Sequence, residues 1–192
     1  MKEIILIGGG GHCRSVIDVI EQEGQFKIVG IVDKALLFGT DVLGYPVFGN
    51  DLDIEKLAKQ YSYALVTIGQ IKSSEQRVKL FDLAKKSGFI LPSIVSPRSY
   101  ISKHAYIGSG VVIMHDVLIN ANASIGDNSI INSKALIEHD SIVGEHCHIS
   151  TNTTINGSVI IEPECFIGSG SVVRESITIK KNSFIKAGSL IK

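Results

Sequence analysis

The chain has 192 residues, of which 44% are hydrophobic and 20% charged, with 19 acidic and 19 basic side chains. This length suffices for one domain or two small ones with a buried core. Balanced charge gives no general basis for binding nucleic acid or an anionic membrane surface, and no apolar run reaches the roughly 18 residues of a membrane span. Three cysteines without a CxxC pair indicate a reduced, cytoplasmic protein rather than a disulfide scaffold.

The first 92 residues alternate between short apolar runs and helical patterns. We expect strands at residues 4–7, 26–32 and 63–68, and helices at residues 12–23 and 74–87. Such alternation is typical of a small Rossmann-like α/β domain, with a parallel sheet and right-handed βαβ crossovers. The boundary of this domain is expected near Pro92.

Four consecutive glycines at residues 8–11 join the first strand to the first helix. A helix entered through glycines favours an anion such as phosphate at its N-terminus. Asp33 ends the second strand, where a ribose hydroxyl is often bound. Cys13 takes the third-glycine place of a GxGxxG fingerprint and only one mononucleotide-sized half is present, so a full dinucleotide site is not expected. A turn that only packs strand against helix is the alternative.

From Val95 to Ile191, every sixth residue is Ile or Val, at seventeen consecutive positions. Two residues before most of them the side chain is small, as in Ala105, Ser129 and Cys147. Neither a helical period nor simple alternation gives this pattern. Six-residue units with one inward aliphatic residue build a triangular prism of 18-residue coils, whose parallel strands stack about 4.8 Å apart. Residues 93–192 therefore resemble the left-handed parallel β-helix of hexapeptide-repeat proteins.

His139 stands out among the six histidines because Glu138 and Asp140 flank it. A carboxylate beside an imidazole can hold the tautomer that accepts a proton, as a general base requires. His148 lies half a coil further along, so the two rings should occupy different faces of one prism. They can share a site only where prisms pack side by side, which predicts an oligomeric active site. His104, like His115, is expected to be an exposed corner residue.

A metal site is the alternative interpretation of this region, since His146 and His148 alternate along a strand with Glu145 nearby. No histidine pair here has the five-residue spacing of the zinc-containing β-helix carbonic anhydrases, so no metal is expected. Cys147 and Cys165 are one 18-residue coil apart. Adjacent coils would permit a disulfide, but both cysteines occupy small-residue core positions, which favours packing.

The C-terminal end is basic. Its last 19 residues hold five bases against Glu175 alone, a net charge of +4; the bases are Arg174, Lys180, Lys181, Lys186 and Lys192. This end could meet the phosphates of a ligand such as coenzyme A. An ordinary solvated end coil is the other interpretation.

Several segments together resemble one family. GGGGH, LGYPVFGN, LIEHD, ISTNTTINGSV and FIGSGSVV are similar to bacterial sugar acyltransferases in which a small nucleotide-binding domain precedes a β-helix. The relatives nearest in pattern are PglD-type UDP-4-amino-sugar N-acetyltransferases and NeuD-type sialic acid O-acetyltransferases. The similarity covers essentially the whole chain. It implies a cytoplasmic homotrimer for surface-glycan biosynthesis, with acetyl-CoA as co-substrate bound between neighbouring prisms.

The resemblance also implies roles for individual residues. His139 matches the catalytic base, and Asp140 stands where the N-acetyltransferases have a glutamate that raises the basicity of the histidine. Asn132 matches a substrate-binding asparagine of the active site. The cofactor-binding positions are His148, Ser169 and Ala187. The nucleotide-sugar pocket corresponds to Gly10, Gly11, His12, Asp33, Lys34 and Gly69.

Two departures from the family pattern bear on these roles. Asp140 is one methylene shorter than glutamate, and the chain closes on AGSLIK without the usual glycine-proline-alanine loop that contacts the coenzyme adenine. Three functions are open at this point. They are N-acetylation of a UDP-linked amino sugar, O-acetylation of a sialic-acid-like sugar, and a non-enzymatic scaffold that senses a nucleotide sugar. In the first, His139 takes a proton from the amine as it attacks the thioester directly.

Overall fold

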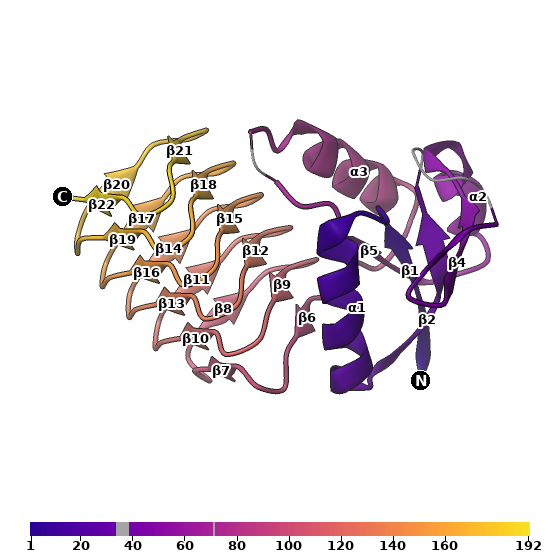
Figure 1. Ribbon diagram of the computed structural model, residues 1–192, viewed down its shortest axis with the longest axis horizontal. Helices are drawn as coiled ribbons and strands as arrows, with labels where there is room; N and C mark the ends of the chain where they lie inside the picture. Colours follow the sequence, from indigo (N-terminus) through magenta and orange to yellow (C-terminus); the bar gives the residue numbers. More distant parts are fainter. Residues whose placement is uncertain (34–38, 71) are drawn as a thin grey trace. The chain divides into compact units, whose positions relative to one another are not determined.

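The computed structural model describes residues 1–33, 39–70 and 72–192. The chain divides into two compact units (Figure 1). The α/β unit comprises Met1–Gly69 and Glu75–Pro92, and the prism unit comprises Gln70–Ser74 and Ser93–Lys192. Each unit is described by itself. None of the helices in the described ranges combines the length and the hydrophobicity that a bilayer crossing demands.

The α/β unit is built on a five-stranded sheet in the order β3-β4-β2-β1-β5. The strands are β1 (Lys2–Ile7), β2 (Phe26–Val32), β3 (Asp41–Val42), β4 (Tyr45–Gly49) and β5 (Tyr63–Val66). The helices are α1 (Gly11–Glu23), α2 (Ile54–Leu57) and α3 (Glu75–Lys86), with a 3₁₀ turn η1 (Asp51–Asp53). The apolar run from Ile4 to Ile7 is fully buried because β1 lies in the interior of the sheet, between β2 and β5.

The parallel sheet and its helices confirm the expected Rossmann-like α/β class. The predicted helix at 74–87 spans 75–86, and the predicted strand at 63–68 ends earlier, at Val66. The hairpin of β3 and β4 was not among the expected strands. Its turn places both Leu43 (φ 52°) and Gly44 (φ 84°) in the left-handed region.

The prism unit consists of three parallel sheets, which we number I to III. Sheet I holds β7 (Tyr100–Ile101), β10 (Leu118–Ile119), β13 (Leu136–Ile137), β16 (Thr154–Ile155), β19 (Val172–Val173) and β22 (Leu190–Ile191). Sheet II holds β8 (Tyr106–Ile107), β11 (Ser124–Ile125), β14 (Ile142–Val143), β17 (Ile160–Ile161) and β20 (Thr178–Ile179). Sheet III holds β6 (Ile94–Val95), β9 (Val112–Ile113), β12 (Ile130–Ile131), β15 (His148–Ile149), β18 (Phe166–Ile167) and β21 (Phe184–Ile185).

Every strand pairs with the strand 18 residues further along, so the hexad aliphatics stack in columns such as Ile119, Ile137 and Ile155. These residues are fully buried and form the narrow core of the prism. Three strands per coil and an uninterrupted register confirm the expected left-handed β-helix (Figure 1).

The corners of the prism repeat a left-handed backbone position every six residues. These positions are Gly110, Asp116, Asn122, Asn128, Lys134, Asp140, His146, Asn152, Ser158, Glu164, Gly170, Ser176, Asn182 and Gly188. Glycine, Asn and Asp occupy most of them because these residues adopt that conformation at low cost. The corners therefore fix where polar side chains leave the prism.

The three cysteines are free and buried. Cys147 and Cys165 point their sulfur atoms at main-chain carbonyl oxygens of the next coil, Glu162 at 3.3 Å and Lys180 at 3.0 Å. These contacts agree with packing in the core rather than with a disulfide.

Candidate active site

The corner between sheets I and II carries an acid–base pair. His139 Nδ1 lies 2.7 Å from Oδ2 of Asp140, and Asn122 donates from Nδ2 to the other oxygen of Asp140 at 2.8 Å. Asn122 occupies the same corner position as Asp140, one coil earlier. The shorter side chain of Asp140 thus still reaches the imidazole, because both residues share one corner and Asn122 holds the far carboxylate oxygen.

The electrostatics of this pair suit a base. The hydrogen bond to Asp140 raises the pKa of His139, against a smaller opposing effect of desolvation. The hydrogen bonds from Asn122 and then from His139 lower the pKa of Asp140, which therefore stays ionised. Because the carboxylate is an acceptor, Nδ1 carries the proton and Nε2 of the neutral ring is left to accept one. The His139 side chain is 60% exposed, so a substrate can reach it.

Gly157 lies beside the His139 ring. A Cβ atom built on Gly157 would stand 2.8 Å from Cε1 and 2.9 Å from Nε2 of His139. The same corner position holds Ala121 two coils earlier and Glu175 one coil later, so the fold accepts side chains there. Glycine at position 157 is therefore explained by the space that the imidazole occupies, a contact that sequence reasoning had not found.

His148 lies on sheet III, whereas His139 lies at the corner between sheets I and II. Within one chain the two histidines therefore occupy different parts of the prism, as the half-coil spacing predicts. It is buried, at 8% exposure. Its Nδ1 lies 2.8 Å from the carbonyl oxygen of Gln70, and its Nε2 lies 3.5 Å from Nδ2 of Asn132. The structure thus brings Asn132 to His148 rather than to His139.

Ser169 and Ala187 follow His148 along the corner between sheets III and I. Ser169 shares a hydrogen bond of 2.8 Å with Ser150, one coil earlier. The backbone nitrogen of Ala187 packs against Gly168 so closely that no Cβ would fit there. Both residues are exposed on this corner.

His115 departs from the expectation of an exposed corner. Its Nδ1 lies 2.7 Å from Ser96 Oγ, and the residue is half-buried. His104 is exposed, as expected.

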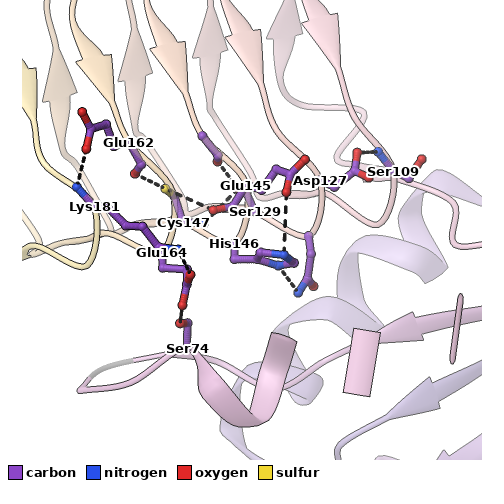
Figure 2. A network of polar contacts seen from close by, with 12 residues as sticks. Ser74, Ser109, Asp127, Ser129, Glu145, His146, Cys147, Glu162, Glu164 and Lys181 are labelled. Carbon is purple, nitrogen blue, oxygen red and sulfur yellow. Dashed lines mark hydrogen bonds and ion pairs between the residues drawn. The ribbon is translucent and has the colours of Figure 1, made fainter. Parts of the chain in front are cut away.

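The corner between sheets II and III contains the residues considered for a metal (Figure 2). His146 Nδ1 lies 3.0 Å from Asn128 Nδ2, and Glu145 is 4.0 Å from its Nε2. Across residues 1–33, 39–70 and 72–192, no three His, Cys, Asp or Glu side chains gather as metal ligands. His146 thus takes part in a network of hydrogen bonds with its own corner.

The glycine loop of the α/β unit divides into two parts. Gly8 has φ +107°, and a Cβ there would collide with Ile68, so the fold itself requires this glycine. Gly10 and Gly11 have no atom within 4 Å of an added Cβ and no positive φ. The helix α1 begins after Gly10 with no side-chain cap on its amides. The open space beside Gly10 and Gly11 fits the close approach of a ligand phosphate.

Three more of the predicted nucleotide residues, His12, Asp33 and Gly69, can be placed by their contacts. Asp33 accepts a 2.6 Å hydrogen bond from the Gly9 amide through Oδ2, so part of its carboxylate supports the loop itself. A Cβ on Gly69 would meet His12 Cβ at 3.4 Å, which places these two residues together. Lys34, also predicted for this pocket, lies outside the described residues.

The basic end is partly neutralised. Ion pairs of 3.5, 3.1 and 3.0 Å join Arg174 to Glu175, Lys180 to Glu162, and Lys181 to Glu164. The net charge of +4 counts only the last 19 residues and so omits Glu162 and Glu164, which lie in the preceding coil. The positive charge at this end of the prism is therefore smaller than that count indicates. Lys186 stands next to Ala187 on the corner between sheets III and I.

Comparison with known proteins agrees with this arrangement. The model described as the PglD N-terminal domain matches residues 3–81, and two hexapeptide-repeat transferase models match residues 122–157 and 158–192. No match is found among curated protein sequences. A left-handed β-helix of transferase hexapeptides behind such a domain defines a class of acetyltransferases.

Two solved structures resemble the whole chain. One is a histidine-to-asparagine variant of perosamine N-acetyltransferase from Caulobacter crescentus, in complex with CoA and GDP-perosamine. It is 33% identical over 100% of this chain and 89% of that one, with a TM-score of 0.93. The other, the acetyltransferase domain of PglB from Neisseria gonorrhoeae, is 27% identical over 100% and 92%, with a TM-score of 0.92. This chain belongs to the PglD-type family of sugar acetyltransferases.

Proposed function

We propose that the protein transfers an acetyl group from acetyl-CoA to the amine of a nucleotide-linked amino sugar. The observation that carries this proposal is the exposed imidazole of His139, hydrogen-bonded to an Asp140 carboxylate that Asn122 holds in turn. The relatives add support, since the Caulobacter enzyme binds CoA and GDP-perosamine and the Neisseria domain has been solved with acetyl coenzyme A.

His139 is the general base of the proposed reaction. The sugar amine attacks the thioester carbonyl carbon while Nε2 of His139 accepts the amine proton. The tetrahedral intermediate then expels coenzyme A by breaking the carbon–sulfur bond, and the proton passes to the departing thiolate. Asp140 keeps Nδ1 protonated and stabilises the imidazolium that forms in between. Proton transfer of this kind contributes about 10²- to 10⁴-fold to a rate.

The loop around Gly10 and Gly11 is the proposed site of the nucleotide diphosphate, with His12, Asp33, Lys34 and Gly69 as further contacts. The space beside both glycines and the uncapped N-terminus of α1 support this assignment. We leave the base of the nucleotide to experiment, because the family resemblance suggests uridine while the Caulobacter relative binds a guanosine sugar. N-acetylation is preferred to O-acetylation, because the similar Caulobacter enzyme is named as a perosamine N-acetyltransferase.

The proposed coenzyme site runs along the corner between sheets III and I. His148 and Asn132 stand at its start, and Ser169 and Ala187 follow one and two coils later. Lys186 adds a positive charge beside Ala187, where a phosphate would gain from it.

We also propose a homotrimer whose active sites lie between neighbouring prisms. Sheets I and II, which flank His139, expose large apolar side chains along their length: Tyr100, Tyr106, Leu118, Ile142, Ile160, Val172 and Leu190. Large apolar side chains gathered on one part of a protein surface mark an interaction site. An interface on these sheets would carry His139 towards the coenzyme corner of the next chain.

A test of the activity is incubation of the protein with acetyl-CoA and a panel of UDP- and GDP-linked amino sugars. Free thiol should appear with at least one of them, and mass spectrometry should find one acetyl group on its sugar. His139→Ala should lower turnover by about 10²-fold or more at an unchanged melting temperature. Acetylation of hydroxyls alone, or no thiol release with any sugar, contradicts the proposal.

A mixing experiment tests the shared site. Light scattering should give three times the 20.7 kDa chain mass. His139→Ala and His148→Ala, each weakly active alone, should regain activity when co-expressed, since some mixed interfaces then contain both histidines. Failure of complementation in confirmed mixed trimers would place both histidines of a site on one chain.

We further propose a cytoplasmic location. Three free, buried thiols suit a reducing compartment, and acetyl-CoA is made and used inside cells. Fractionation of cells that produce the protein tests this.

A further inference from the structure

His148 is held in one orientation by a main-chain carbonyl from a distant part of the sequence. Its Nδ1 lies 2.8 Å from the carbonyl oxygen of Gln70, 78 residues earlier. A carbonyl only accepts hydrogen bonds, so Nδ1 must carry a proton and Nε2, which lies 3.5 Å from Nδ2 of Asn132, is the acceptor atom of the ring. The Phe166 ring packs edge-on against the imidazole, at 5.2 Å between centroids. The ring has little freedom, and its tautomer depends on where Gln70 stands.

Glu164 anchors the chain around Gln70. The Gln70 side chain donates from Nε2 to the carbonyl oxygen of Glu164 at 3.3 Å. Ser74 donates to the Glu164 carboxylate at 3.0 Å, and Lys181 pairs with its other oxygen at 3.0 Å (Figure 2). Gln70 and Ser74 are 4% and 5% exposed, so both are packed in place. Glu164, a single corner residue, therefore holds both Gln70 and Ser74.

The charge of Glu164 strengthens this anchor. The hydrogen bond from Lys181 holds the pKa of the Glu164 carboxyl below its usual range, so the group is ionised at neutral pH. Hydrogen bonds to an ionised carboxylate are about twice as strong as neutral ones. Glu164 also sits at a left-handed corner (φ 66°), where Asn or Gly would be less strained. The contacts of its carboxylate with Ser74 and Lys181 explain why a glutamate occupies this position.

We propose that Glu164 is a positioning residue for His148: it holds Gln70 so that the Gln70 carbonyl fixes the His148 tautomer with a proton on Nδ1. The consequence for catalysis rests on the proposed function, in which His148 and Asn132 stand at the start of the coenzyme site. Gln70 directly follows Gly69 of the predicted nucleotide pocket in the chain.

The direct test is the tautomer of His148 in protein labelled with ¹⁵N-histidine, with His148→Gln used to assign its signals. The wild-type protein should show the proton on Nδ1 of the neutral ring. Glu164→Ala should give a mixture of tautomers, and Glu164→Gln, which keeps an acceptor oxygen for Ser74, should stay closer to wild type. Ser74→Ala loosens the same anchor without changing a residue of the β-helix coils and should act in the same direction.

Glu162→Ala is the matched control. Glu162 lies in the same coil as Glu164 and pairs with Lys180 and with the Lys181 amide of the next coil, but it has no hydrogen bond to residues 70 or 74 among the described contacts. It should leave the tautomer unchanged. In kinetics, Glu164→Ala should raise the KM for acetyl-CoA about tenfold, the effect of one charge-assisted hydrogen bond, with a smaller change in kcat.

An unchanged His148 tautomer in a folded Glu164→Ala protein overturns the inference, as does an equal effect of Glu162→Ala. The magnetic resonance measurement needs no substrate and so does not depend on the proposed activity. A tautomer that depends on Glu164 in a protein that transfers no acetyl group would overturn the proposed function and leave the positioning contact in place.

Discussion

Replacing Gly157 with alanine should remove most of the activity while leaving the prism folded. A Cβ atom there would lie 2.8 Å from Cε1 of His139, whereas non-bonded carbons sit about 3.5–4.0 Å apart. The ring must therefore retreat by about 0.7–1.2 Å, and it has room to do so because its side chain is 60% exposed. A reacting group misplaced by about 1 Å can cost about 10²-fold in rate. We expect that loss in kcat/KM with little change in Tm.

The assay is thiol release with acetyl-CoA and the best amino-sugar substrate, alongside thermal unfolding. In a His139→Ala background the same Gly157→Ala change should cost nothing further, because the ring it displaces is gone. If Gly157→Ala keeps kcat/KM within about twofold of wild type, the imidazole does not act from its observed position. An equal loss of Tm in both backgrounds would instead trace the effect to the backbone at position 157.

Three further changes test other parts of the structure. Because His139 acts as the neutral base and Asp140 raises its pKa, Asp140→Asn should move the acid limb of the pH–kcat/KM profile to lower pH and reduce the plateau; an unmoved limb contradicts the pairing. Gly11→Ala should keep or slightly raise Tm, since alanine favours the first turn of α1, yet raise the KM for the nucleotide sugar. Gly8→Ala, at φ +107°, should unfold the α/β unit more readily and serves as the contrasting variant. Burial raises the pKa of Cys13 to about 11, so Cys13 in the native protein should resist iodoacetamide at pH 8 and react only when the protein is unfolded, as mass spectrometry of its peptide can measure.

The β-helix was predictable because each coil side uses one inward aliphatic residue, and the core leaves no freedom to depart from that period. Columns such as Ile119, Ile137 and Ile155 show the rule directly. Parallel strands around a glycine-entered helix were equally visible, since Ile4–Ile7 is buried on both faces and must be continuously apolar. The hairpin after β2 was not, because Leu43 takes a left-handed turn position that Asn or Gly usually signals, and Pro46 lies inside a strand.

The acid–base pair could be predicted because His139 and Asp140 are neighbours in sequence. Asn122 and Gly157 could have been found from the 18-residue coil, which places each one coil away from its partner. The link from Gln70 to His148 had no such signal, because Gln70 lies 78 residues before His148 and outside the hexapeptide repeats. Long-range hydrogen bonds to a main-chain carbonyl leave no trace in side-chain type.

Because left-handed corners recur every six residues, corner side chains occupy a regular set of fixed positions along the prism. Side chains at the corners leave the prism along one of three edges, at heights separated by about 4.8 Å, the spacing of stacked strands. Inserting or deleting one whole coil would keep every strand paired and every corner intact, as in other stacked repeats. A coil inserted after Ser158 would leave His139 and Gly157 in contact, but it would move Ala187 one coil further from His148. The distance between His148 and Ala187 along the proposed coenzyme site can thus change only by whole coils. A ligand of fixed length can therefore match only one number of coils.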